Sequence, residues 1–176
     1  KKEVTPEWKK IKKVINPKTG EYETYDKVSF PCIDAAKKAK NLPEKLKAVL
    51  YGDDKGAKFA WKVQASALIY AANRIPEISD TVVEIDNAMK WGYNFEMGPF
   101  ETWDAIGVKE SVGKMEKEGL KVPEKVKKML AKGATSFYKL EKGKVMFFDF
   151  ASESYKPVKV SPKALALANF KAEKKV

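Results

Sequence analysis

The chain has 176 residues, of which 44% are hydrophobic, and this composition excludes a mainly disordered protein. It contains no histidine and a single cysteine, Cys32, which excludes histidine-based acid–base catalysis, a thiol–imidazole pair and zinc sites of ordinary ligand spacing. The formal net charge of +11 raises the hypothesis of nucleic-acid binding. The lone cysteine favours a packed, inert thiol and a reducing compartment, which makes the cytoplasm the expected location.

The distribution of the charge favours a solvated surface. Of the 35 basic residues only Arg74 is an arginine, whereas base readout favours the guanidinium fork. Lysines alternate with glutamates over most of the chain, as they do on solvated helix faces and in proteins of thermophiles. The longest apolar run, residues 65–72, is far shorter than the roughly 20 residues that span a bilayer, so we expect no membrane segment. A lysine-rich module that binds nucleic acid or another polyanion is the alternative hypothesis.

The first predicted element is a β-hairpin in KKVINPKTGEYETYDKV, where apolar strands flank a turn at residues 16–20. The segment KVMFFDFASESYKPVKV near the C-terminus has the same plan, and each is followed by an alanine-rich stretch. Aligning Tyr22 with Tyr155 also matches Asn16 with Asp149, Thr19 with Ser152, and Ile15 with Phe148. This similarity predicts an internal repeat whose preceding copy lies upstream in a longer parent protein. The first residue, Lys1, agrees with that expectation because it is not a methionine.

Between the hairpins the pattern is helical. Helices are predicted over residues 43–52, 55–76, 81–91, 99–106, 108–118 and 123–132. The segment 55–76 carries apolar side chains around nearly its whole circumference, which predicts a buried central helix. Thr81 and Glu84 form a predicted capping box, and Gly92 is the predicted end of that helix.

After Gly133 the residues alternate at period two around a turn at 141–144, and a third strand is predicted at 155–160. The chain is thus predicted to be mainly α-helical, with small β-hairpin appendages at both ends. We divide it into a hairpin tail of a preceding repeat at residues 1–30, a helical domain at 31–135, and a β-meander with a linker at 136–176.

Few residues suggest chemistry. Paired carboxylates occur at Glu84 with Asp86 and at Glu101 with Asp104, and such pairs can perform general acid–base catalysis, although helix caps and surface charges are the more frequent role. Arg74 can bind an anion or pair locally at a helix end. The sequence contains neither a Walker loop nor a G-x-G-x-x-G fingerprint.

The stretch NAMKWGYNFEMGPFETWDAIG, residues 87–107, is the most aromatic part of the chain. Its aromatic residues either staple two helices together or anchor an interface, and the sequence favours neither alternative. They are Trp91, Tyr93, Phe95, Phe100 and Trp103.

The longer stretch EIDNAMKWGYNFEMGPFETWDAIGV resembles the signature of the C-terminal helical domain of 3-hydroxyacyl-CoA dehydrogenases. The matching residues are Asp86, Ala88, Met89, Gly92, Met97, Gly98, Pro99, Phe100, Glu101, Asp104 and Gly107. The sequence is further similar to the second helical copy in proteins that fuse this dehydrogenase to an enoyl-CoA hydratase. The resemblance implies a helical array like the C-terminal domain of 6-phosphogluconate dehydrogenase.

The family implies a parent enzyme of fatty-acid β-oxidation that oxidises 3-hydroxyacyl-CoA with NAD. The catalytic His–Glu pair and the NAD site of the family lie in an N-terminal Rossmann domain, which this chain does not contain. The first helical copy carries an active-site asparagine in a V-N-R run, and Trp61, Lys62 and Val63 occupy that place here. The resemblance therefore implies that this chain holds no catalytic, cofactor-binding or metal-binding residue.

The implied role is packing, completion of the acyl-CoA cleft or dimerisation. The implied partners are the preceding Rossmann and first helical domains, a following enoyl-CoA hydratase domain, the acyl-CoA substrate of the parent and, in a homodimer, a second copy. The signature and interface candidates are Asp86, Trp91, Gly92, Phe95, Gly98, Pro99, Phe100, Glu101, Trp103 and Asp104.

Overall fold

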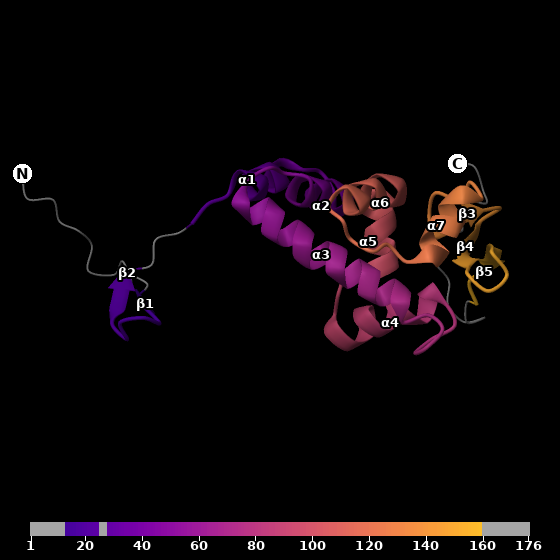
Figure 1. Cartoon of the computed structure of the whole chain (residues 1–176), viewed down its shortest axis with the longest axis horizontal. Helices are drawn as coiled ribbons and strands as arrows, with labels where there is room; N and C mark the ends of the chain where they lie inside the picture. The colour runs from indigo at the N-terminus through magenta and orange to yellow at the C-terminus, as the bar shows by residue number, and fades with distance from the viewer. Residues whose placement is uncertain (1–12, 25–27, 160–176) are drawn as a thin grey trace, which may run out of the picture.

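A computed structural model describes residues 13–24 and 28–159 of the chain. These residues form seven helices and two small antiparallel sheets (Figure 1). The helices are α1 (Pro31–Lys38), α2 (Leu42–Leu50), α3 (Lys55–Asn73), α4 (Val82–Tyr93), α5 (Pro99–Ile106), α6 (Val108–Lys117) and α7 (Glu124–Ala131). The mainly α-helical prediction is confirmed. None of the described helices combines the length and the apolar character needed to cross a membrane.

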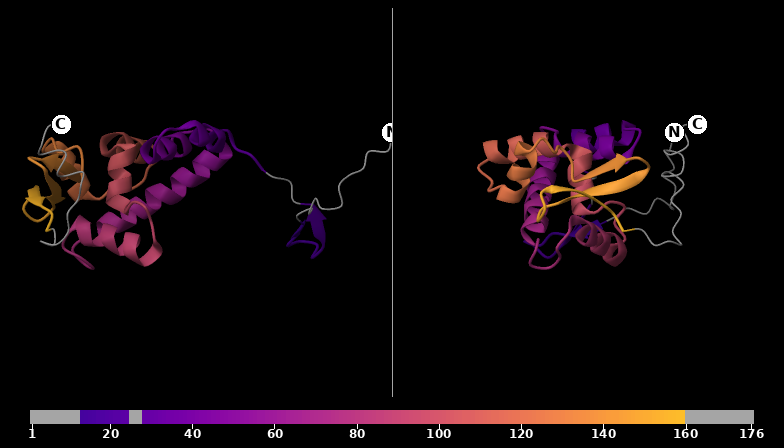
Figure 2. Two further views of the ribbon diagram at one scale, coloured as in Figure 1. Left: turned by 180° about the vertical axis from the view of Figure 1, so that it is seen from behind. Right: turned by 90° about the vertical axis from the view of Figure 1, so that its right-hand side faces the viewer.

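The long helix α3 organises the helical body. It begins at the cap Asp54, whose side chain accepts a hydrogen bond from the backbone N–H of Ala57 at 3.0 Å. In Figures 1 and 2, α1 and α2 lie along one side of α3 and α4 lies along another. The buried face of α3 carries Trp61, Ala65 and Leu68, which pack into one hydrophobic core with residues of α5, α6 and α7.

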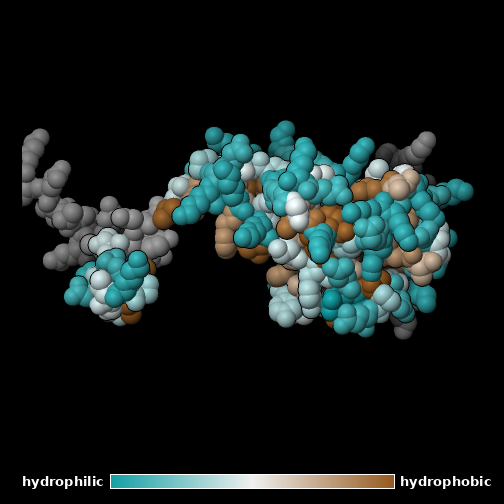
Figure 3. Space-filling model, viewed as in Figure 1, coloured by the Kyte–Doolittle hydropathy of each residue, from teal (hydrophilic) through white to brown (hydrophobic). Residues whose placement is uncertain are grey.

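The prediction that this helix is buried all round is wrong. Phe59, Val63 and Tyr70 are 72%, 55% and 62% exposed. Trp61 and Leu68 face the core, whereas these three side chains remain in contact with solvent in the described part of the chain. The hydropathy view in Figure 3 accordingly shows hydrophobic patches among the hydrophilic side chains of the helical body.

The capping box predicted at Thr81 and Glu84 forms only in part, because the Glu84 carboxylate accepts from the hydroxyl of Thr81 rather than from its backbone N–H, which bonds Ser79. Thr81 accepts from the backbone N–H of Val83 and donates to the carboxylate of Glu84. Helix α4 does not end at Gly92, which lies inside it, but at Asn94, whose φ of 56° is left-handed. Asparagine tolerates this conformation, so Asn94 caps the helix two residues after the glycine that was expected to end it.

The second sheet contains β3 (Tyr138–Glu141), β4 (Lys144–Asp149) and β5 (Ser154–Pro157) in the order β3-β4-β5, all antiparallel. The β3–β4 turn adopts positive φ at Lys142 and Gly143, where it was predicted. Phe147 and Phe148 of β4 are buried against the helices. The predicted third strand is confirmed as β5, although residue 160 lies outside the described residues.

The first sheet is the predicted N-terminal hairpin, formed by β1 (Lys13–Ile15) and β2 (Tyr22–Thr24). All of its strand residues are exposed, and Figure 1 draws it apart from the helical body. Residues 1–12 and 25–27, which belong to the predicted segment 1–30, lie outside the described residues. The assignment of this segment to a preceding repeat remains a prediction.

The single cysteine is packed, as predicted. Cys32 is 3% exposed, and its thiol donates to the Asp54 carboxylate at 3.3 Å. Burial, together with the neighbouring carboxylate, raises the pKa of the Cys32 thiol, which keeps it protonated and unreactive.

Candidate functional site

Six of the signature residues meet where α4, α5 and β3 come together. Asp86 lies in the middle of α4, and the other five lie at the start of α5 or one turn into it. These five are Gly98, Pro99, Phe100, Glu101 and Asp104. We call the carboxylates Asp86, Glu101 and Asp104 the carboxylate cluster.

Asp86 caps a helix to which it does not belong. It is 1% exposed, and one carboxylate oxygen accepts from the backbone N–H of Phe100 at 2.8 Å. The other oxygen accepts from the backbone N–H of Glu101 at 3.1 Å and from the hydroxyl of Tyr138 at 2.8 Å. The first N–H groups of a helix have no partner within the helix, and a negative charge there also complements the helix dipole. Asp86 therefore fixes the start of α5.

Gly98 allows the two helices to approach this closely. A Cβ atom at Gly98 would lie 2.4 Å from the Cα atom of Asp86, a distance that real contacts do not reach. Its φ of −76° suits any residue, so the requirement for glycine comes from space rather than from the backbone angle. Pro99 follows at the first helical position, where its missing N–H costs nothing.

Glu101 completes the cap and adds an ion pair. One carboxylate oxygen accepts from the backbone N–H of Gly98 at 2.8 Å, and the other contacts the ammonium of Lys90 at 2.6 Å. The side chains of Lys90 and Glu101 are 26% and 28% exposed. This pair joins α4 to α5 beside the buried Asp86.

Asp104 fastens the sheet to the helices. Its two carboxylate oxygens accept from the backbone N–H groups of Phe137 and Tyr138 at 2.7 and 2.8 Å. Phe137 is fully buried, with its ring 4.9 Å from that of Phe100 and 5.3 Å from that of Trp103. Asp104 thus sets the start of β3 against the aromatic core.

Burial dominates the electrostatics of the carboxylate cluster. Desolvation raises the pKa of Asp86 to about 6 and that of Asp104 to about 7, and it outweighs the backbone N–H groups that favour the ionised forms. Repulsion from Glu101 adds to both shifts. Desolvation also raises the pKa of Tyr138, so its phenol stays protonated and remains a hydrogen-bond donor.

An open groove of about 570 Å³ lies beside the cluster. Lys90, Glu101, Asp104 and Tyr138 line it together with apolar side chains, among them Met97. Each oxygen of the carboxylate cluster accepts a hydrogen bond or an ion-pair contact from within the protein, so the cluster is tied to the fold. Within residues 13–24 and 28–159, no group of three or more acidic or cysteine side chains has an arrangement that could hold a metal ion.

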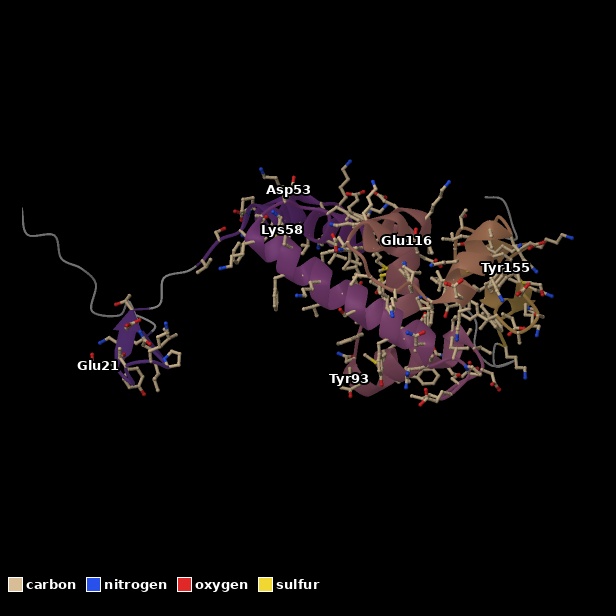
Figure 4. All side chains as sticks on the ribbon, viewed as in Figure 1. Glu21, Asp53, Lys58, Tyr93, Glu116 and Tyr155 are labelled. Atoms are coloured by element: carbon tan, nitrogen blue, oxygen red, sulfur yellow. The ribbon has the colours of Figure 1, made fainter. Side chains whose placement is uncertain are left out.

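The aromatic residues of the signature divide into two groups. Phe100 and Trp103 are fully buried, and the indole N–H of Trp103 donates to the hydroxyl of Ser111 at 2.7 Å. Trp91, Tyr93 and Phe95 are 80%, 70% and 53% exposed, and Figure 4 shows Tyr93 at the end of α4, at the edge of the molecule. These three exposed residues therefore do not hold two helices together in the way that the first alternative predicted.

Of the two predicted carboxylate pairs, the structure keeps Glu101 with Asp104 but separates Glu84 from Asp86. Glu84 is exposed and bonds Thr81, whereas Asp86 lies near Glu101 and Asp104. Residues two positions apart point to different sides of a helix, so the sequence itself held a signal against the pair of Glu84 and Asp86. Sequence reasoning also missed Lys90 and Tyr138.

Arg74, the other candidate residue, forms a local pair, which is one of the two roles predicted for it. Its guanidinium contacts the carboxylate of Glu77 at 2.8 Å and lies 4.8 Å from the ring centre of Tyr70. The arginine is thus held at the end of α3 by its own neighbours in sequence.

Comparison with known proteins assigns the sequence that forms this site to a family. The model of the family described as "3-hydroxyacyl-CoA dehydrogenase, C-terminal domain" matches residues 59–145. A probable 3-hydroxyacyl-CoA dehydrogenase of Bacillus subtilis (strain 168) is 40% identical over 162 residues, which are 92% of this chain and 20% of that protein. A putative fatty acid oxidation complex trifunctional enzyme of Rickettsia felis is 33% identical over 93 residues, 53% of this chain and 11% of that protein. No solved structure gives a significant match.

The chain spans about one fifth of the length of the Bacillus relative. The range matched by the family model contains the whole carboxylate cluster, Gly98 and Tyr138. The chain therefore belongs to the 3-hydroxyacyl-CoA dehydrogenase family and contains a C-terminal domain of that family.

Proposed function

We propose that the chain is a non-catalytic helical domain of an NAD-dependent 3-hydroxyacyl-CoA dehydrogenase of fatty-acid β-oxidation. The observation that carries this proposal is the use of the carboxylate cluster. Asp86 and Asp104 bind backbone N–H groups of α5 and β3, and Glu101 binds Gly98 and Lys90. These contacts bind all three carboxylates to backbone groups or to Lys90, which supports a structural role rather than the role of a general base.

The described residues at the start of α5 do not fit NAD. A dinucleotide pyrophosphate binds the free N–H groups at the start of a helix that follows a glycine-rich loop. At the start of α5, where Gly98 and Pro99 suggest such a loop, Asp86 already occupies the N–H groups of Phe100 and Glu101. NAD is then held by a Rossmann domain of the parent protein.

The proposed parent is a cytoplasmic protein that contains a Rossmann domain and a first helical domain before this chain and an enoyl-CoA hydratase domain after it. The chain's small share of its relatives' length, and the printed name of the Rickettsia relative as a trifunctional enzyme, support this arrangement. The exposed apolar residues Phe59, Val63 and Tyr70 of α3 support a packing role, either against another domain or in a dimer. We assign the helices to a 6-phosphogluconate-dehydrogenase-like C-terminal fold as part of the same proposal.

The test is a turnover assay of the isolated chain. With NAD and 3-hydroxybutyryl-CoA, the absorbance of NADH should not rise, whereas the full-length dehydrogenase under the same conditions should give turnover. NAD-dependent oxidation that stays with the chain through purification would overturn the proposal.

The alternative, a binding module for polyanions, finds less support. Several described lysines pair with carboxylates, among them Lys37 with Asp34 and Lys139 with Glu141. Binding to random DNA that weakens steeply with salt would favour the alternative over a helical packing domain.

A further inference from the structure

The two hairpins of the chain share one register. In the first, Ile15 of β1 lies opposite Tyr22 of β2. In the second, Phe148 of β4 lies opposite Tyr155 of β5. The shift along the sequence that carries Ile15 onto Phe148 also carries Tyr22 onto Tyr155, so both hairpins enclose loops of equal length between equivalent pairs.

Both loops contain a residue of left-handed conformation at the equivalent position. Gly20 adopts a φ of 74°, and Glu153, at the equivalent position, adopts a φ of 50°. A left-handed glutamate is uncommon, so its coincidence with a glycine indicates a shared loop geometry rather than a shared composition. Asn16, which follows β1, and its equivalent Asp149, the last residue of β4, each accept a hydrogen bond from a backbone N–H of the loop that follows.

The side chain of Asn16, or of its equivalent Asp149, also contacts the opposite strand of its hairpin. The side-chain amide of Asn16 donates to the carboxylate of Glu23 at 2.7 Å. At the equivalent positions, Lys156 contacts the carboxylate of Asp149 at 2.5 Å. The donor is the first residue of the pair in one hairpin and the second residue in the other, but the two positions in contact are the same. This is expected if the two hairpins are diverged copies of one element.

The hairpins differ in what covers them. Phe148 is 3% exposed, whereas its counterpart Ile15 is 55% exposed. Tyr155 is half-buried and donates its hydroxyl to the carbonyl of Ser136 at 2.6 Å, whereas its counterpart Tyr22 is 67% exposed. The first hairpin therefore has an apolar pair in the position where the second hairpin packs on the helical body.

We propose that β1–β2 is the closing hairpin of a preceding helical unit, and that Ile15 and Tyr22 dock on that unit's counterpart of α7. In the present unit, Phe148 lies beside Lys125, Lys128 and Met129 of α7. The proposed binding partner of Ile15 and Tyr22 is thus a helix of the preceding unit that, like α7, presents an apolar side chain between lysines. This inference rests on the proposed function in one respect, namely that the chain is part of a longer dehydrogenase.

Hydrogen exchange measured by mass spectrometry tests the docking directly. In the isolated chain, the amides of residues 13–24 should exchange quickly. In the dehydrogenase expressed from its full reading frame, they should exchange roughly tenfold more slowly or better, because docking buries the strands. Equal rates in both proteins would overturn the proposal. Protection that appears in the isolated chain and grows with concentration would also overturn it, since the hairpin would then dock on a second copy.

Matched variants locate the contact. Ile15→Asp should leave the melting temperature of the isolated chain unchanged but should abolish the protection of residues 13–24 in the full-length protein. The equivalent change Phe148→Asp should lower the melting temperature of the isolated chain, and Phe148→Ala provides a milder form if the aspartate variant does not fold. Protection that survives Ile15→Asp in the full-length protein would contradict the docking. The NADH assay reads the proposed function separately, so the two ideas can fail independently.

Discussion

The hydroxyl of Tyr138 donates a hydrogen bond to the buried carboxylate of Asp86 at 2.8 Å, and so joins β3 to α4. The same carboxylate caps α5, and Asp104 of α5 holds the backbone at the start of β3. The acidic residues of the family signature therefore form a joint between the helices and the sheet.

Removing the hydroxyl of Tyr138 tests this joint. Tyr138→Phe should lower the free energy of unfolding by about 1–2 kcal/mol, because Asp86 loses a buried donor. Urea denaturation followed by circular dichroism measures the change. Tyr70→Phe is the matched control, since Tyr70 is 62% exposed, and it should change the stability by less than about 0.5 kcal/mol. Equal effects of the two substitutions would contradict the role given to Tyr138.

The close approach at Gly98 gives a second prediction. Gly98→Ala should destabilise the protein by about 1–3 kcal/mol or more, because the new methyl group overlaps Asp86. Gly92→Ala should instead stabilise it by about 0.4–1 kcal/mol, since Gly92 lies inside α4 with open space beside it. Thermal unfolding of both variants checks this difference in sign, and a shift in the same direction for both would refute the steric explanation.

The raised pKa values predict how stability depends on pH. Asp86 and Asp104 bind protons more tightly in the folded protein, with pKa values of about 6 and about 7 in place of 3.8. Their contribution to stability is therefore complete below about pH 4 and is lost as the pH rises through 6 and 7, by about 1.4 kcal/mol per pH unit for each proton.

The variant Asp104→Asn cannot take up this proton. Its unfolding free energy should depend less steeply on pH between 4 and 7 than that of the unchanged chain, whatever its absolute stability. Denaturant unfolding at several pH values measures both slopes. Parallel slopes would show that Asp104 titrates near its ordinary pKa in the folded state.

Substitutions on the two faces of α3 should lower the free energy of unfolding by very different amounts. Trp61→Ala should destabilise the protein by about 3–5 kcal/mol, because Trp61 is 2% exposed in the core. Phe59→Ala, two positions earlier and 72% exposed, should cost less than about 0.5 kcal/mol. Melting temperatures of the isolated chain measure both changes, and a large loss for Phe59→Ala would mean that this face is packed after all.

The sequence predicted where helices and strands form better than it predicted which of their faces are covered. Turn and cap chemistry placed the start of α5 at Gly98 and Pro99, and it placed the hairpins at their turns, because these signals act within a few residues. The exposed face of α3 was not predictable, since apolar residues around a helix do not say whether each side meets a partner. The link between Asp86 and Tyr138 arises from the packing of α4, α5 and β3, which no local pattern records.

The most direct test of the account is the kcat of the proposed full-length parent dehydrogenase carrying Glu101→Gln. Glu101 lines the open groove together with Asp104, and its side chain is 28% exposed, so a ligand in the groove can reach it. If the cluster only supports the fold, kcat should stay within about twofold of the unchanged enzyme, since general acid–base catalysis is worth about 10²–10⁴-fold. A fall in kcat of about 100-fold at an unchanged melting temperature would contradict the account and would make Glu101 a catalytic residue.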